Sequence, residues 1–149
     1  MAEDVDGVDR QILDVLAVDG RISIRALAER VHISRANAYA RVERLRSSGV
    51  ILGFRAEVSP EAVGLRTSAY VTLNLHQTEW RTVQQRLLQV PGVVHVALVG
   101  GEFDVVLLVR ARDNADLRRV VLDEVQAIEG VTSTRTLLFF DESEPARHG

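Results

Sequence analysis

The second half of this 149-residue chain repeats weakly with a period of about 38 residues, and this repeat constrains the fold more than any other feature. Each copy reads as strand, helix and strand, and Pro91-Gly92 or Glu129-Gly130 ends the helix. Two β-α-β halves joined by a hairpin predict a ferredoxin-like βαββαβ sandwich, whereas two copies are too few for a solenoid. The first copy has Val71, Val83, Leu87, Val90, Gly92 and Val93 where the second has Val109, Val121, Val125, Ile128, Gly130 and Val131.

One face of the predicted sheet needs a partner. A ferredoxin-like sheet packs its helices on one face, yet V-V-H-V-A-L-V and V-V-L-L-V are apolar at odd and even positions alike, as in strands buried on both faces. A large apolar patch marks an interface, so we expect self-association through this face. Strands that are merely rich in valine are the alternative. The expected strands are 67–75, 93–99, 104–111 and 131–140, and the expected helices are 79–89 and 114–128.

Three helical patterns precede the sandwich. Apolar residues recur at helical spacing across 8–18, and Asp9 falls in the first turn, where a negative charge suits the helix dipole. Ser23 and Ser34 are expected N-caps of the second and third helices, and Gly49 is expected to end the third. The spacing of the second helix, a three-residue turn and the third helix is that of a helix-turn-helix.

The chain therefore divides into parts of different character. Residues 50–58 predict short β structure with Gly53 as a turn, which completes a winged helix-turn-helix in residues 1–58. Ser59-Pro60 opens a linker, 59–66, with room for a short helix. The sandwich then occupies 67–140, and a polar flexible tail occupies 141–149. The expected fold class is α+β.

Charge is unevenly distributed along the first half. The net charge of −3 argues against general nucleic-acid binding, and all 18 basic residues are arginine. Residues 20–58 carry eight Arg against three acids, whereas residues 1–19 carry six acids against one Arg. On the third helix, one stripe contains Asn37, Ala40, Arg41 and Arg44, on roughly the opposite side from the apolar Ala38, Val42 and Leu45.

This stripe makes the third helix a candidate recognition helix. In a helix-turn-helix, N-terminal residues of the second helix meet base edges and flanking cations contact phosphates. Arg35 could grip a guanine and Asn37 an adenine. The alternative is a basic helix that only forms salt bridges with the acidic first helix. The candidate DNA-binding residues are Ser34, Arg35, Ala36 and Asn37 near the bases, and Arg41, Arg44 and Arg55 near the phosphates.

The sequence gives little support for a metal site, an enzyme or a membrane protein. The chain has no cysteine, and none of its four histidines has carboxylates at metal-ligand spacing, so we expect no metal and no cofactor. Ser68 and Ser133 have no visible base to activate them, so we expect no enzyme activity. No apolar run approaches the ~20 residues of a membrane span, and the acidic start lacks a secretory signal. These features predict a cytoplasmic protein without a membrane partner.

The hairpin between the two copies contains G-G-E-F-D at 100–104. The chain has no lysine and a strand follows the glycines, which excludes a Walker loop and a dinucleotide fingerprint. Two interpretations stay open. Gly100 and Gly101 permit the positive φ angles of a tight turn, or they leave space and bare N–H groups for a ligand carboxylate. In the second case Glu102 or Asp104 could meet an ammonium group.

The order of motifs along residues 8–140 resembles the leucine-responsive regulator/AsnC family, the feast/famine transcription regulators. The motifs are V-D-R-Q-I-L-x-x-L-x-x-D-G-R-I-S (8–23), L-A-E-R-V-x-I-S (27–34), R-V-E-R-L-R-S-S-G-V-I-L-G-F (41–54), V-G-L (63–65), V-P-G-V (90–93), G-E-F-D (101–104) and G-V-T-S-T-R-T (130–136). The chain departs from the family pattern at His32, where a glycine commonly ends the second helix, and at Gly100, where a larger residue is usual.

The resemblance implies a function for both halves. A winged helix-turn-helix would bind operator DNA, and the sandwich would pair into dimers that associate into octamers. An effector, in many members an amino acid, would bind between sandwich domains. The alternatives are a ligand-independent DNA-organising protein and, more remotely, a small enzyme on the sandwich. The effector residues implied are Gly101, Asp104, Thr134 and Thr136, with Gly100, Glu102 and Phe103 beside them on the loop.

Overall fold

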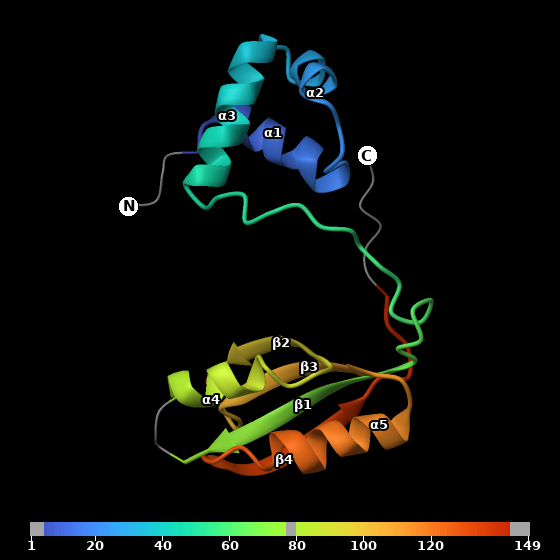
Figure 1. The fold of residues 1–149 in the computed structure, drawn as a ribbon. Helices are drawn as coiled ribbons and strands as arrows, with labels where there is room; N and C mark the ends of the chain where they lie inside the picture. The colour runs from blue at the N-terminus through green and yellow to red at the C-terminus, as the bar shows by residue number, and fades with distance from the viewer. Residues whose placement is uncertain (1–4, 77–79, 144–149) are drawn as a thin grey trace. The chain divides into compact units, whose positions relative to one another are not determined.

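A computed structural model describes residues 5–76 and 80–143 (Figure 1). These residues form two compact units, an N-terminal one that ends at residue 57 and a C-terminal one at 58–143. Position 79 of the expected fourth helix and residues 144–149 of the expected tail lie outside the described residues. None of the helices in the described part is long and apolar enough to span a bilayer.

The N-terminal unit consists of three helices around one apolar cluster. They are α1 (Gly7–Val18), α2 (Ile24–Arg30) and α3 (Arg35–Ser47) (Figure 1). Each contributes inward residues at helical spacing, as the sequence predicts. The buried cluster contains Ile12 from α1, Leu27 from α2, Val31 after it, and Val42 and Leu45 from α3.

Helix ends in this unit follow their local sequence. The hydroxyls of Ser23 and Ser34 each accept from the backbone N–H three residues on, at 3.1 Å, which confirms both as N-caps. Gly49 has φ 79°, as a glycine after a helix should. His32 is the one non-glycine residue of the described ranges with positive φ, 57°, so the turn between α2 and α3 does rest on a histidine in left-handed conformation.

The predicted β structure at 50–58 is wrong for this chain, because these residues form no strand. Leu52 is 97% exposed, and Phe54 reaches back so that its Cδ1 lies 3.3 Å from where a Cβ on Gly20 would stand. A two-stranded ribbon this short is marginal without a third strand or a packed face. The linker likewise contains turns rather than a helix at 60–64.

The C-terminal unit has the ferredoxin-like order predicted from the repeat. An antiparallel sheet runs β2-β3-β1-β4, and the helices pack on one face of it. The α+β fold class is thereby confirmed. The elements are β1 (Thr67–Leu75), α4 (Trp80–Leu87), β2 (Val93–Leu98), β3 (Val105–Ala111), α5 (Asn114–Arg119), η1 (Val120–Val125) and β4 (Val131–Leu138).

The second helix of this unit differs from the prediction. The expected helix 114–128 begins as α5 but continues as the π-helical η1 and ends at Val125. The wider turn leaves Val120, Val121 and Val125 all buried against the sheet. Apolar spacing cannot separate α from π winding over so few residues, since both put these side chains on one face.

The two faces of the sheet are buried to different degrees. On β3, Val105, Leu107 and Val109 are fully buried beneath the helices, whereas Val106 and Leu108 are only half-buried on the open face. On the neighbouring strands the open face presents Tyr70, which is 44% exposed, and Leu137, which is 49% exposed. In the single chain, the face of the sheet that the helices do not cover therefore keeps exposed apolar surface.

Candidate nucleic-acid interface and effector loop

The first turn of α3 presents the predicted base-reading residues to solvent. Arg35, Ala36 and Asn37 are all exposed, and the buried Ala38 follows them. The hydroxyl of Ser34 accepts from the backbone N–H of Asn37, so its first role is to cap the helix. The exposed start of α3 is therefore fixed by a cap and by a buried anchor residue.

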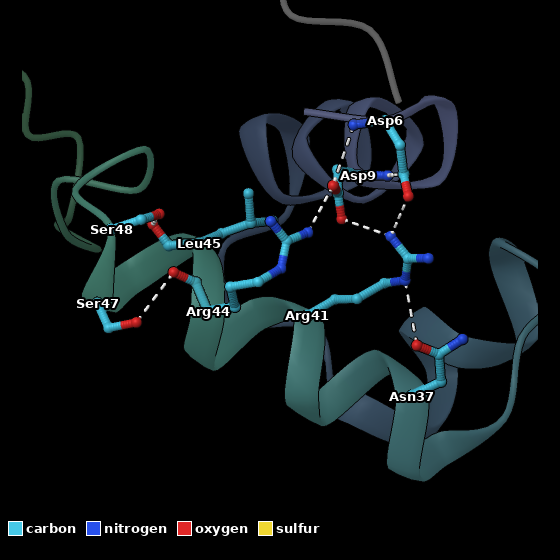
Figure 2. Close-up of polar contacts among 8 residues, drawn as sticks. All are labelled: Asp6, Asp9, Asn37, Arg41, Arg44, Leu45, Ser47 and Ser48. Atoms are coloured by element: carbon cyan, nitrogen blue, oxygen red, sulfur yellow. Dashed lines mark hydrogen bonds and ion pairs between the residues drawn. The ribbon is translucent and has the colours of Figure 1, made fainter. Parts of the chain in front are cut away.

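Arg41 and Arg44, predicted as phosphate contacts, turn toward α1 (Figure 2). Nη1 of Arg41 donates to Asp6 Oδ2 at 2.7 Å and to Asp9 Oδ1 at 2.8 Å. Nη2 of Arg44 donates to the other Asp9 oxygen at 2.6 Å. The arginine side chains remain 22% and 35% exposed, respectively. The stripe thus forms salt bridges with the acidic first helix, as the alternative interpretation held, and its contact with phosphate stays a prediction.

Asp6 and Asp9 hold each other as well as the arginines. Asp6 is the N-cap of α1, and each aspartate accepts from the backbone N–H of the other in a capping box. The N–H of Asp9 and the Arg41 guanidinium keep the pKa of Asp6 below its ordinary value. Burial alone would raise the pKa of Asp9, but donors from Arg44, Arg41 and the Asp6 backbone outweigh burial and lower it. Both carboxylates are therefore charged at neutral pH.

The G-G-E-F-D segment closes a turn that is tied to β1. The N–H of Val99 donates to the carbonyl of Asp104 at 2.9 Å, and the N–H of Asp104 donates to the carbonyl of Leu73 at 3.0 Å. The Asp104 carboxylate also accepts from the N–H of Leu75 at 2.8 Å. Gly101 has the predicted positive φ, 124°, but Gly100 does not, so that part of the prediction is wrong.

Space and charge around this loop favour a site as well as a turn. A Cβ built on Gly100 or Gly101 would meet nothing within 4 Å. Nη1 of Arg135 lies 3.8 Å from Glu102 Oε1, and its Cζ lies 5.2 Å from the ring centre of Phe103. The loop therefore combines open space with groups of both signs.

The structure does not bring Thr134 and Thr136 to the same face as Arg135. Thr134 accepts a hydrogen bond of 2.6 Å from Nε2 of Gln126, on the helix-covered side of β4. Thr136 lines a hollow of about 270 Å³ against α5 and η1. Side chains alternate along a strand, so Arg135 points to the opposite face. Within one chain, the two threonines are separate from the surroundings of Glu102 and Phe103.

Sequence reasoning missed three contributors to these regions. Asp6 lines a hollow of about 410 Å³ together with Asn37, Ala40, Arg41 and Arg44. Asp9 lies buried beneath it and pairs with both arginines. The available signal for the two aspartates was an acidic run that precedes a basic helix. Arg135 lies opposite Thr72, and no local signal identified it because the sequence segment does not give the strand register. In the residues described, no group of three or more His, Asp or Glu could hold a metal ion.

Comparison with known proteins decides the family. The winged helix-turn-helix DNA-binding model matches residues 5–51, and the Lrp/AsnC ligand binding domain matches residues 68–147. The chain belongs to the Lrp/AsnC family. It is a DNA-binding protein of a family of transcription regulators, built from a winged helix-turn-helix and a ligand-binding sandwich. In this chain the wing residues 50–58 carry no strand.

Individual relatives of this Lrp/AsnC protein cover nearly its whole length. The HTH-type transcriptional regulator AldR of Mycolicibacterium smegmatis is 37% identical over 143 residues, which is 94% of this chain and 84% of AldR. The feast or famine regulatory protein of M. tuberculosis, solved with L-methionine, is 32% identical with a TM-score of 0.89, covering 98% and 99% of the two chains. A transcriptional regulator of Neisseria meningitidis, also solved with L-methionine, is 25% identical with a TM-score of 0.86, covering 95% and 94%.

Proposed function

We propose that this chain is a cytoplasmic, non-enzymatic transcription regulator that binds operator DNA as a homo-oligomer. The first turn of α3 meets base edges, and a small molecule, an amino acid, binds at the sandwich and biases assembly. Two reading heads in a dimer make the target an imperfect palindrome or several phased sites. The observation that carries the proposal is the exposed start of α3, with Arg35 and Asn37 on a helix anchored to α1 through the buried Asp9.

The effector part rests on the loop and on the relatives. Gly100 and Gly101 leave open space beside the exposed Glu102, and Asp104 supplies a second carboxylate. These groups suit an ammonium group, and Arg135 suits a carboxylate, which together are the two charges of a free amino acid. Two structural relatives were solved with L-methionine.

Self-association is supported by the open face of the sheet. Tyr70, Leu137 and the half-buried Leu108 give it apolar surface, which a second sandwich would cover. We propose a homodimer through this face, with dimers assembling to an octamer. Sedimentation velocity tests this directly: a monomer at micromolar concentration contradicts it.

One observation favours a second candidate, a DNA-organising protein without an effector. The Asp104 carboxylate already accepts from the N–H of Leu75, so the loop has a structural use that needs no ligand. The two candidates differ in whether an amino acid stabilises the protein.

Selection from a pool of random duplex DNA tests the DNA-binding part. We expect the wild-type protein to enrich a two-fold symmetric sequence, because each dimer presents two α3 helices. Arg35→Ala should weaken binding to the enriched duplex. If no sequence is enriched, operator binding is refuted.

A thermal-shift screen with the proteinogenic amino acids tests the effector part. A ligand of the folded state raises the melting temperature with its concentration. Asp104→Asn is the decisive variant, because an amide oxygen can still accept from Leu75 while the negative charge is gone. We expect one amino acid to stabilise the wild type and to lose this effect in Asp104→Asn. If no amino acid stabilises the protein, the candidate without an effector is the better one.

A further inference from the structure

We infer that Arg41 is a positioning residue for Asn37. Asp6 and Asp9 hold the guanidinium of Arg41, and Arg41 in turn holds Asn37 and fixes which edge of that amide faces DNA. The inference rests on the proposed function, since it takes Asn37 to be a reader of base edges. It concerns the exposed start of α3 and the hollow beside it, which Asp6, Asn37, Ala40, Arg41 and Arg44 line.

Three hydrogen bonds from one side chain form the connection (Figure 2). At its tip, Nη1 of Arg41 donates to Asp6 at 2.7 Å and to Asp9 at 2.8 Å. Closer to the helix, Nε of Arg41 donates to Oδ1 of Asn37 at 3.1 Å, one turn earlier on α3. Arg41 therefore links a buried carboxylate to an exposed amide.

The chemistry of the pair determines the orientation of the amide. A guanidinium N–H only donates, so the Asn37 atom that faces it must be the carbonyl oxygen and not the amide nitrogen. A solvent-exposed asparagine would otherwise exchange its oxygen and nitrogen by rotation about its last torsion angle. Arg41 selects one of the two orientations.

Arg41 can hold Asn37 because Arg41 is itself held. Asp9 is fully buried in α1, and its carboxylate is fixed further by Arg44 and by the Asp6 backbone. The Arg41 side chain is only 22% exposed. The entropy of ordering Asn37 is thus lost largely on folding rather than on binding DNA, which favours affinity for the matching base.

The fixed orientation of the Asn37 amide determines which base edge it can pair with. The two Nδ2 hydrogens face away from Arg41, and Oδ1 keeps one lone pair. In the major groove adenine offers an acceptor beside a donor, whereas cytosine offers only a donor. In this orientation the Asn37 amide can donate from Nδ2 to the acceptor of adenine and accept at Oδ1 from its donor, so it favours adenine. It disfavours cytosine, because cytosine offers only a donor and would require Oδ1 to point outward.

The variant Arg41→Lys separates the positioning of Asn37 from the effect of the positive charge. Lysine can still pair with Asp6 and Asp9, but it has no Nε–H in the guanidinium geometry to hold Asn37. Arg46→Lys is the matched control, because Arg46 lies on the same helix and donates instead to Glu43, at 3.0 Å. Asn37→Ala marks the base position that depends on the amide. Circular dichroism of each variant confirms that the helices are retained.

Selection from random duplex DNA, sequenced for each variant, gives the first readout. Asn37→Ala and Arg41→Lys should both lose a roughly tenfold preference at the same base position of each half-site, while Arg46→Lys keeps the wild-type profile. The inference is overturned if folded Arg41→Lys keeps the preference that Asn37→Ala loses. It is also overturned if Arg41→Lys weakens all positions equally, which would mark a phosphate contact.

Nuclear magnetic resonance of the free protein gives a second readout that needs no DNA. The side-chain amide of Asn37 should be more ordered than that of Gln11, an exposed residue of α1, and should fall to the Gln11 level in Arg41→Lys. Equal order in the wild type would overturn the inference. A wild type that enriches no DNA sequence refutes the proposed function instead, and this second readout still decides the positioning role.

Discussion

Nη2 of Arg44 in α3 lies 2.6 Å from Oδ2 of Asp9, whose side chain is fully buried in α1. A charge with no exposure requires a partner, and two arginines of the basic helix supply it. The same residues that make α3 look like a phosphate-binding helix therefore also hold it against α1. Arg44 and Arg41 therefore both tie α3 to α1 through Asp9.

Asp9→Asn should destabilise the N-terminal unit by about 2 kcal/mol, since the substitution keeps the shape but removes the charge that accepts hydrogen bonds from Arg41 and Arg44. Urea unfolding followed by far-ultraviolet circular dichroism measures the change. Trp80, the only tryptophan, packs in the C-terminal unit, so its fluorescence transition should not move. Asp14→Asn, at an exposed position of α1, is the control. Equal stability of the two variants would contradict the role given to Asp9.

Asp6→Asn should reduce the dependence of stability on acid pH. The folded pKa of Asp6 lies below the ordinary 3.8, so its charge stabilises the fold fully above about pH 5, and this is lost as pH falls through 3.8 toward the folded pKa. Asparagine caps a helix equally well, so the variant lacks mainly the charge. The urea midpoint of each protein is measured from pH 6 to pH 3, in steps on the order of one pH unit. The two midpoints should differ at pH 6 and converge at the acid end. A constant difference would contradict this.

Gly92→Ala should cost about 2–3 kcal/mol, whereas Gly100→Ala should cost almost nothing. A Cβ on Gly92 would stand 2.7 Å from the carbonyl oxygen of Arg110, and φ there is 93°. Gly100 has open space and no positive φ. Thermal unfolding of the two variants, side by side, checks the contrast. Similar melting temperatures would show that the approach of Gly92 to β3 is not close.

Asp104→Ala should destabilise the C-terminal unit by about 1–2 kcal/mol even without ligand, because the half-buried end of β1 loses the acceptor for the Leu75 N–H. Asp104→Asn should lose much less, since its amide oxygen can accept instead. The fluorescence of Trp80 during urea unfolding measures both. If the two variants are equally stable, the bond to Leu75 contributes nothing and only a ligand role remains for Asp104.

Local features were predictable because they depend on neighbouring residues. Ser23, Ser34 and Gly49 take the cap positions that their types favour, and the repeat in the second half fixes the strand order. Residues 50–58 were predicted wrongly because β-forming composition becomes a strand only where another strand pairs with it.

For contacts between distant residues, the sequence indicated the kind of interaction but not the residues that form it. The acidic start and the basic α3 suggested salt bridges, yet nothing local identifies Asp9 as buried or Arg41 as shared between Asp6, Asp9 and Asn37. Around the loop, alternation along β4 separates Arg135 from Thr134 and Thr136 once the register is known. Register follows from the whole sheet and not from the segment G-V-T-S-T-R-T.

The most direct test of DNA recognition by α3 is the affinity of Arg35→Ala for a duplex that the wild type selects. Arg118→Ala is the control, because it removes the same charge from α5 in the C-terminal unit. The account predicts that Arg35→Ala weakens binding roughly tenfold and that Arg118→Ala leaves it unchanged at the same salt concentration. An Arg35→Ala protein that binds as tightly as the wild type would contradict it.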